Sequence, residues 1–314
     1  PLMLSAAIVG FGAIAGGHED LALPMTHSAS YKIHSDRVQV VAIAEPDTAQ
    51  HDAIGKVWPV ARIYESAEAL IADETIDIVS LCGSPSLTQD FFADPTMTDN
   101  LKGVWCEKPV ALSVNQLDVL ATNVSPTLPV QINVWRRFVP EIAELTQQLM
   151  NGDFGKVHQA VAYYAKYISD NGVHIVDLAH QCLGELSVRF IDDGTDQQAP
   201  TVFAVNGDGA GCTFLPVPRD SYNIFELDIL CELGRVRIAE NGRRIELQAY
   251  QQDGDFPHLQ ILEPARNTIK CDWKQSFDSA LGNLLDHVQN QNIPLASSFA
   301  MSMPAARFAV SCTS

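Results

Sequence analysis

Ala6-Ala-Ile-Val-Gly-Phe-Gly-Ala-Ile-Ala15 is the stretch of sequence that decides the fold. Its first four residues are a short apolar run, which favours a central parallel strand buried on both faces. The two glycines then let the backbone turn tightly and approach a pyrophosphate, and Ala15 permits close packing of a following helix. The stretch therefore predicts a Rossmann dinucleotide-binding domain, and the residues expected to contact the cofactor are Gly10, Phe11, Gly12, Ala13 and Ile14.

A second strand is expected over Val38 to Ala44, and it ends at Glu45. A carboxylate at this position can accept hydrogen bonds from the adenosine ribose hydroxyls and would repel a 2′-phosphate, so the sequence favours NAD over NADP. Glu45 lies further from the glycines than the usual spacing of roughly 20 residues, which predicts a longer connection over residues 24–37. The alternative interpretation is that Glu45 is a surface turn residue.

Two more apolar runs, Ile76 to Cys82 and Gly103 to Cys106, have the pattern of buried parallel strands. The first ends in a turn at Ser84-Pro85, where cofactors bind in open α/β sheets. The second leads into Glu107-Lys108-Pro109. Lys108 could deliver its ammonium to the reactive end of the cofactor, while Glu107 is expected mainly to brace the loop. The expected cofactor contacts in this region are therefore Ser84, Pro85, Glu107 and Lys108.

The sequence pattern changes near residue 125, which divides the chain into an expected Rossmann domain over 1–125 and an α+β domain over 126–314. A helix is expected over Pro140 to Asn151, and several strand-like runs follow, separated by turns such as Asn206-Gly207 and Asn241-Gly242. They predict a large, open, mostly antiparallel sheet backed by few helices. The C-terminal helix is a candidate to pack back on the first domain.

Composition narrows the class of protein. Lys and Arg number 20 and Asp and Glu 38, a formal charge of −18, so nucleic acid and membrane partners are not expected. The apolar stretches are too short and too interrupted to cross a bilayer, and Leu2 to Phe11 has the pattern of a strand, not of a signal peptide. Seven scattered cysteines without a Cys-x-x-Cys pair indicate reduced thiols in a cytoplasmic protein, and no metal site is expected.

The chain resembles the glucose–fructose oxidoreductase / inositol dehydrogenase / rhizopine-catabolism family of NAD(P)-dependent oxidoreductases. Four ordered motifs carry the resemblance over nearly the whole chain. They are the glycine turn continuing to His18, the Glu107-Lys108-Pro109 segment, the Asn-Val-Trp-Arg-Arg-Phe-Val-Pro stretch of residues 133–140, which resembles the family's Asn/Tyr-x-x-Arg-Phe-x-Pro pattern, and the Asp-x-Gly-x-His-x-x-Asp motif of residues 170–177. In the third motif, Arg136 and Arg137 either bind an anionic substrate or, as we favour, have a structural role.

Two departures from the family pattern concern the predicted site. The family's Thr-Pro-Asn-x-x-His turn is Ser84-Pro85-Ser86-Leu-Thr-Gln89 in this chain, so contacts near the nicotinamide or the substrate are expected to differ. Almost no loop separates the strand expected over Val157 to Ile168 from Asp170, whereas relatives often have a long one. A short loop leaves the substrate pocket more open, or leaves part of it to a partner subunit.

Hydride transfer from a carbinol carbon also requires removal of the hydroxyl proton. Histidine suits proton transfer near neutral pH, and lysine suits stabilisation of the developing alkoxide. Our hypothesis, which the resemblance also implies, is that His174 is the general acid/base, Lys108 hydrogen-bonds the reacting hydroxyl and Asp170 positions both. A helix starting at Asp170 would place Asp170 and His174 on one face. Asp177 is a secondary candidate with a structural role.

The predicted function is that of an NAD(P)-dependent dehydrogenase or reductase, NAD-preferring, acting on CH–OH groups of a sugar, cyclitol or related polyol. One alternative is an enzyme that oxidises a sugar transiently with bound NAD to enable elimination or hydrolysis. Another is a non-catalytic NAD-binding sensor, against which the presence of Lys108, Asp170 and His174 argues. The resemblance also implies a homodimer or homotetramer formed through the C-terminal sheet.

Overall fold

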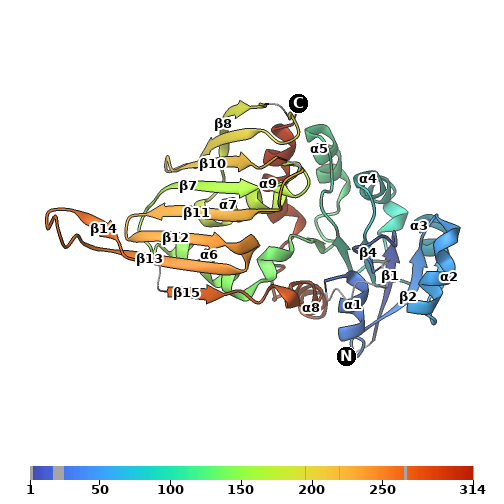
Figure 1. The fold of residues 1–314 in the computed structure, drawn as a ribbon. Coiled ribbons are helices and arrows are strands. Elements are labelled where there is room, and N and C mark those ends of the chain that lie inside the picture. The colour runs from blue at the N-terminus through green and yellow to red at the C-terminus, as the bar shows by residue number, and fades with distance from the viewer. Residues whose placement is uncertain (1–2, 17–24, 195, 219, 265–266, 314) are drawn as a thin grey trace. The chain divides into compact units, whose positions relative to one another are not determined.

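The structure of the protein is a computed structural model that describes residues 3–16, 25–194, 196–218, 220–264 and 267–313. The chain forms two compact units, each of which contains two separate segments (Figure 1). The first unit comprises Pro1–Phe138 and Lys274–Met303, and the second comprises Val139–Trp273 and Pro304–Ser314.

The first unit contains a six-stranded sheet in which every strand pairing is parallel. The strand order is β3-β2-β1-β4-β5-β6. Successive strands are added on one side of β1 up to β3 and on its other side from β4 onward, so the strand order reverses between β1 and β4. This is the doubly wound Rossmann topology, and it confirms the fold predicted for the N-terminal half. The strands are β1 Leu4–Val9, β2 Val38–Ala44, β3 Arg62–Tyr64, β4 Ile78–Leu81, β5 Gly103–Cys106 and β6 Val130–Ile132.

Four helices of the first unit, α1, α3, α4 and α5, begin at side-chain caps that satisfy free backbone N–H groups. The hydroxyls of Thr26, Ser66, Ser84 and Ser113 each accept a hydrogen bond from a backbone N–H in the first turn of the helix that follows. The helices are α1 His27–Ile33, α2 His51–Val57, α3 Ala67–Asp73, α4 Pro85–Ala93, α5 Val114–Asn123 and α8 Ser276–Gln289, with 3₁₀ turns η1 Thr48–Gln50, η2 Pro95–Met97 and η3 Trp135–Phe138.

Helix α8 completes the core of this unit although it lies far along the chain. Its apolar side chains recur every three to four residues, which places them on one face of the helix. They are fully buried in a cluster with Trp105 of β5, Ile8 of β1 and Ile78 of β4. The contributing residues of α8 are Phe277, Ala280, Leu281, Leu284 and Leu285.

The second unit contains a nine-stranded sheet with the order β14-β13-β12-β11-β7-β10-β9-β8, and β15 pairs with β13. Every named pairing is antiparallel except β10 with β7, so the prediction of a mostly antiparallel sheet is confirmed. The strands are β7 Val157–Tyr164, β8 Ser187–Asp192, β9 Thr201–Val205, β10 Gly211–Pro216, β11 Phe225–Cys231, β12 Gly234–Ala239, β13 Arg244–Gln252, β14 Gln260–Leu262 and β15 Asn267–Lys270.

One face of this sheet is apolar and buried. Side chains alternate along β11, with Phe225, Leu227 and Ile229 buried and the intervening residues more exposed. Helix α7 (Gly172–Leu183) packs on β7 and β11, and α6 (Pro140–Asn151) packs on α7. Helix α6 ends at Gly152, whose φ of 81° is left-handed and accommodated by glycine. The last helix, α9 (Phe299–Ser311), contains Pro304.

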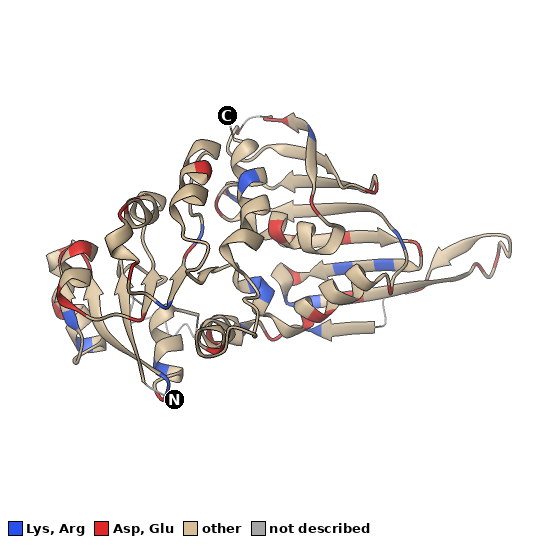
Figure 2. Cartoon of the chain, turned by 180° about the vertical axis from the view of Figure 1, so that it is seen from behind, with Lys and Arg blue, Asp and Glu red and all other residues tan. Residues whose placement is uncertain are grey.

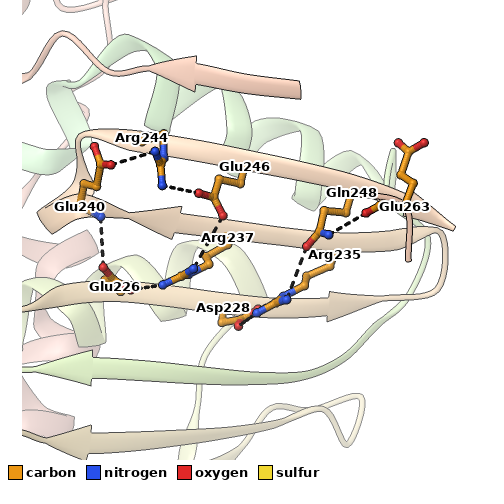
Figure 3. A network of polar contacts seen from close by, with 9 residues as sticks. All are labelled: Glu226, Asp228, Arg235, Arg237, Glu240, Arg244, Glu246, Gln248 and Glu263. Atoms are coloured by element: carbon orange, nitrogen blue, oxygen red, sulfur yellow. Dashed lines mark hydrogen bonds and ion pairs between the residues drawn. The ribbon is translucent and has the colours of Figure 1, made fainter. Parts of the chain in front are cut away.

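The opposite face carries a ladder of ion pairs across β11, β12 and β13 (Figure 3). Arg237 contacts Glu226 at 2.6 Å and Glu246 at 3.8 Å, and Arg244 contacts Glu246 at 2.6 Å. Arg235 pairs with Asp228 on the neighbouring strand. Single exposed ion pairs contribute little to stability, but cross-strand pairs of this kind join three adjacent strands side by side.

Acidic residues occur in both units (Figure 2). No helix within the described part of the chain is long and apolar enough to cross a membrane. All seven cysteines are buried and free.

Candidate functional site

The carboxyl ends of β1, β2 and β4 surround a pocket of about 610 Å³ in the first unit. Its position at the strand-order reversal is where nucleotide cofactors bind in open α/β sheets. Of the predicted cofactor residues, five line this pocket: Gly10, Phe11, Gly12, Glu45 and Ser84. Sequence reasoning missed other residues of its lining, among them Glu65, Ser66, Glu68, Ser86 and Asp90.

Gly10 is required by the backbone around it. Its φ is +82°, a conformation that residues with a Cβ rarely adopt. A Cβ at this position would lie 3.1 Å from the backbone nitrogen of Gly83 and 3.2 Å from its Cα. Gly10 therefore lets the turn after β1 approach the turn after β4.

Gly12 has a different environment. A Cβ built on Gly12 would meet no atom within 4 Å, and the residue lines the pocket. The missing side chain leaves open space at the point where the glycine turn is expected to approach a pyrophosphate. This open cradle fits a bound dinucleotide.

The segment after the glycine turn differs from the sequence-based expectation. Residues 12–16 form turns, and the first helix in the described residues begins at His27, inside the region where a longer connection was expected. His27 N donates to the Ile14 carbonyl at 3.1 Å, so the start of α1 lies against the turn. Ala13 and Ile14 thus belong to the turn but not to the pocket lining, and His18 lies outside the described residues.

Glu45 is held by backbone donors at the end of β2. It is 7% exposed, and its carboxylate accepts hydrogen bonds from Phe11 N at 2.8 Å and Asp47 N at 2.9 Å. These contacts tie the carboxylate to the glycine turn at the pocket rim. Each carboxylate oxygen has a further lone pair that can accept a hydrogen bond.

Every charged residue among the described lining of the pocket is a carboxylate. Besides Glu45, Glu65 and Glu68 come from the segment where α3 begins, and Asp90 comes from α4. Four negative groups around one pocket repel a phosphate monoester such as the 2′-phosphate of NADP. They suit neutral hydroxyl groups, which can donate hydrogen bonds to the carboxylates.

Glu107 and Lys108 follow directly after β5, which pairs with β4. Glu107 is 9% exposed, and its Oε1 contacts His27 Nε2 at 3.0 Å and Asn133 Nδ2 at 2.5 Å. Lys108 is half-buried, and the Lys108-Pro109 peptide bond is cis. Neither Glu107 nor Lys108 lines the described pocket, and Pro85, at the first position of α4, does not line it either.

The altered turn after β4 has its own hydrogen bonds. Ser84 caps α4, and its hydroxyl lies 2.7 Å from that of Ser86. Gln89 donates its side-chain amide to the Val110 carbonyl at 3.2 Å. The residue that replaces the family's histidine therefore contacts the segment that carries Lys108.

The remaining candidates lie in the second unit. The expectation of a helix starting at Asp170 is wrong, because α7 begins at Gly172 and Asp170 lies in the preceding turn. Asp170 N donates to the Tyr167 carbonyl at 3.3 Å, which closes that turn. His174 lies in the first turn of α7 and is 4% exposed. Asp177 is 1% exposed and accepts a hydrogen bond from Gln181 Nε2 at 2.7 Å.

Arg137 has a structural role in the first unit. Its guanidinium donates to the carbonyls of Ala296 and Met301, at 3.1 Å each, and it is 8% exposed. Arg136 stacks over the Trp135 ring at 4.1 Å.

Residues 4–125 match the family model described as "Oxidoreductase family, NAD-binding Rossmann fold", GFO_IDH_MocA. The match is confined to the N-terminal part of the chain, and it agrees with the resemblance to the glucose–fructose oxidoreductase / inositol dehydrogenase / MocA family that the sequence motifs carry. Members of this family are NAD-binding oxidoreductases.

Two curated relatives are similar to this chain. D-glucoside 3-dehydrogenase from Escherichia coli is 23% identical over 222 residues, which is 63% of this chain and 59% of the relative. Inositol 2-dehydrogenase from Mycolicibacterium smegmatis is 29% identical over 188 residues, which is 56% of this chain and 51% of the relative. The chain thus matches about 59% and 51% of the length of these two relatives.

A solved structure of similar fold is an oxidoreductase from Agrobacterium radiobacter in complex with NAD+, L-tartaric acid and magnesium. The match has a TM-score of 0.72 and 16% identity, and it covers 97% of this chain and 94% of the other. At this identity the similarity concerns the fold.

Proposed function

We propose that this protein is an NAD-preferring dehydrogenase that transfers a hydride between nicotinamide and the CH–OH carbon of a sugar, cyclitol or related polyol. The observation that carries the proposal is the pocket at the strand-order reversal, where Gly12 leaves open space and Glu45 is oriented by two backbone donors. Bound NAD would supply the hydride-accepting ring.

Cofactor binding is assigned to residues at the carboxyl edge of the first sheet. Gly10 and Gly12 let the backbone approach the pyrophosphate, with Phe11, Ala13 and Ile14 completing the turn. Glu45 accepts hydrogen bonds from the adenosine ribose hydroxyls, and the carboxylates nearby disfavour the 2′-phosphate of NADP. Ser84, Pro85, Glu107 and Lys108 are assigned to the nicotinamide side.

Proton transfer is assigned to Lys108, His174 and Asp170. The ammonium of Lys108 donates to the reacting hydroxyl and stabilises its developing negative charge. The imidazole of His174 accepts the hydroxyl proton, and Asp170 positions the substrate and the imidazole. The burial of His174 supports this role, because a base shielded from water is held in a defined orientation.

The substrate class is supported by the names of the relatives, which are dehydrogenases of a glucoside and of inositol. Both molecules are rings bearing several hydroxyl groups. A neutral polyol also avoids the repulsion that an anionic substrate would meet from a chain of formal charge −18.

A panel of sugars and cyclitols, assayed with NAD and with NADP at 340 nm, tests the cofactor and the substrate class together. We expect Lys108→Ala and His174→Ala each to lower turnover at least about 100-fold, the usual scale for a proton-transfer group, while NAD still binds. Lys270→Ala and His258→Ala, at exposed positions of the second unit, are the matched controls. Near-wild-type turnover in either site variant would refute the assignment.

We also propose that the protein forms a homodimer or homotetramer through the nine-stranded sheet. The sheet face that carries the ion-pair ladder has half-buried charges, and Leu230 of the same strand face is 45% exposed. A second copy would cover this face. Light scattering is expected to give a mass of two or four chains, and a monomer mass would contradict the proposal. The buried free thiols support a reducing, cytoplasmic location.

A further inference from the structure

A buried network of polar side chains includes Glu107, the residue before Lys108, and contains none of the residues assigned to proton transfer. Glu107 Oε1 contacts His27 Nε2 at 3.0 Å, and His27 Nδ1 lies 2.9 Å from Ser80 Oγ. Ser80 Oγ is in turn 2.8 Å from the Tyr31 hydroxyl. Asn133 Nδ2 donates to the same carboxylate oxygen of Glu107.

This polar network is shielded from water. His27, Ser80 and Asn133 are 0% exposed, and Tyr31 is 1% exposed. Burying five polar groups costs free energy unless each one is hydrogen-bonded, and apolar residues of similar size often stabilise a core equally well. The arrangement therefore calls for an explanation other than stability.

The hydrogen bonds of this network have a single direction when the His27 imidazole is neutral. A carboxylate at Glu107 only accepts, so His27 Nε2 donates to it, and Nδ1 of the neutral ring accepts from the Ser80 hydroxyl. Ser80 Oγ in this arrangement accepts from the Tyr31 hydroxyl. Burial raises the pKa of Tyr31, which keeps the phenol a neutral donor. The imidazole plane is fixed by Trp105, whose ring centroid is 3.7 Å away.

The strand–turn segment containing Lys108 is also held on its other side. Gln89 donates to the Val110 carbonyl at 3.2 Å, and Thr88 Oγ1 lies 3.8 Å from Cys106 Sγ. Contacts thus fix the residue before Lys108 and the residue two positions after it. Because its neighbours in the chain are held, Lys108 loses little conformational entropy when a substrate binds.

We propose that His27 is a positioning residue that acts through Glu107 to hold Lys108 in its reactive orientation. The catalytic consequence rests on the proposed dehydrogenase function, whereas the effect on Lys108 itself does not. Loss of His27 leaves the Glu107 carboxylate buried without its imidazole donor, and the turn that carries Lys108 then relaxes.

The first test is independent of turnover. Competitive acylation with acetic anhydride, read by mass spectrometry of the peptides, gives the relative reactivity of single lysines against pH. In His27→Ala we expect the reactivity of Lys108 relative to Lys270 to change at least roughly threefold, about half a pKa unit. His34→Ala is the matched control. His34 is the C-terminal cap of the same helix, α1, and it pairs with Asp278 at 2.6 Å, so it is not part of the polar network around Glu107.

A second variant covers the case in which His27→Ala fails to fold. His27→Gln retains a side-chain amide that can donate to Glu107, and it is expected to restore most of the wild-type reactivity of Lys108. Unchanged Lys108 reactivity in a folded His27→Ala protein, or an equal change in His34→Ala, would overturn the proposal.

The second test uses the coupling of two variants in an active enzyme. His27→Ala is expected to lower kcat at least about tenfold with little change in NAD affinity. In a Lys108→Ala background, the same substitution is expected to lower kcat by less than about twofold. Additive losses would overturn the proposal. If the wild-type enzyme turns over no polyol while Lys108 reactivity still depends on His27, then the dehydrogenase function fails and the positioning role stands.

Discussion

Substituting alanine for each glycine of the turn after β1 separates folding from cofactor binding. Gly10 has a φ of +82° and would place a Cβ 3.1 Å from Gly83 N, whereas a Cβ on Gly12 would meet no atom within 4 Å. Gly10→Ala is therefore expected to destabilise the folded protein, and Gly12→Ala is expected to act on the pocket alone.

The magnitudes follow from these two environments. A left-handed conformation costs an alanine about 1–2 kcal/mol, and contact with the backbone of the next turn costs about 1–3 kcal/mol. The reduced freedom of the unfolded chain offsets about 0.4–1 kcal/mol of this. The net loss for Gly10→Ala is then about 1–4.6 kcal/mol, or roughly 2–18 °C in Tm for a unit of this size. Gly12→Ala should change the free energy of unfolding by less than about 1 kcal/mol.

Thermal unfolding followed by circular dichroism measures the first effect, and calorimetric titration with NAD measures the second. Gly12→Ala is expected to melt with the wild type and to bind NAD at least about tenfold more weakly, a loss of about 1.4 kcal/mol, because its methyl group occupies the cradle. Wild-type NAD affinity in Gly12→Ala would refute the placement of the pyrophosphate. Wild-type stability in Gly10→Ala would refute the packing argument.

Two further predictions concern charge. Glu45→Gln keeps an acceptor at the pocket rim but removes its negative charge, so the affinity ratio of NAD to NADP, measured by titration, should fall at least about tenfold; an unchanged ratio would contradict the role of Glu45. Partial burial would raise the pKa of Asp77, but hydrogen bonds from Lys102 and Ser5 outweigh it and lower that pKa. Its stabilising contribution is therefore present at neutral pH and lost as the pH falls below about 4, and acid unfolding of Asp77→Asn should show a weaker pH dependence than that of the wild type.

Local sequence patterns predict those strands whose burial follows a regular pattern along the chain. The apolar runs at β1 and β4 are buried on both sides, so their composition alone indicates parallel strands. β11 is buried on one face and alternates accordingly. In contrast, every residue of β14 and β15 is exposed, and neither strand has a pattern that distinguishes it from a loop.

The candidate site is predictable only where its residues follow one another in the chain. The glycine turn and Glu45 belong to one βαβ unit with a known geometry, which makes both of them identifiable. His27, Ser80 and Asn133 converge on Glu107 from separate elements, and nothing in their local sequence marks them. The start of α7 was misplaced for a related reason, since the turn at Asp170 depends on a backbone contact with Tyr167.

Transfer of deuterium from substrate to cofactor is the most direct measure of hydride transfer by this protein. A polyol from the panel, deuterated at the carbinol carbon, would be oxidised by the wild-type protein with NAD, and the product NADH would be analysed by mass spectrometry and NMR. We expect one deuterium at C4 of the nicotinamide ring, and at least about 100-fold less labelled NADH formed by Lys108→Ala in the same time. Unlabelled NADH, or no turnover of any polyol by a protein that binds NAD, would contradict this expectation.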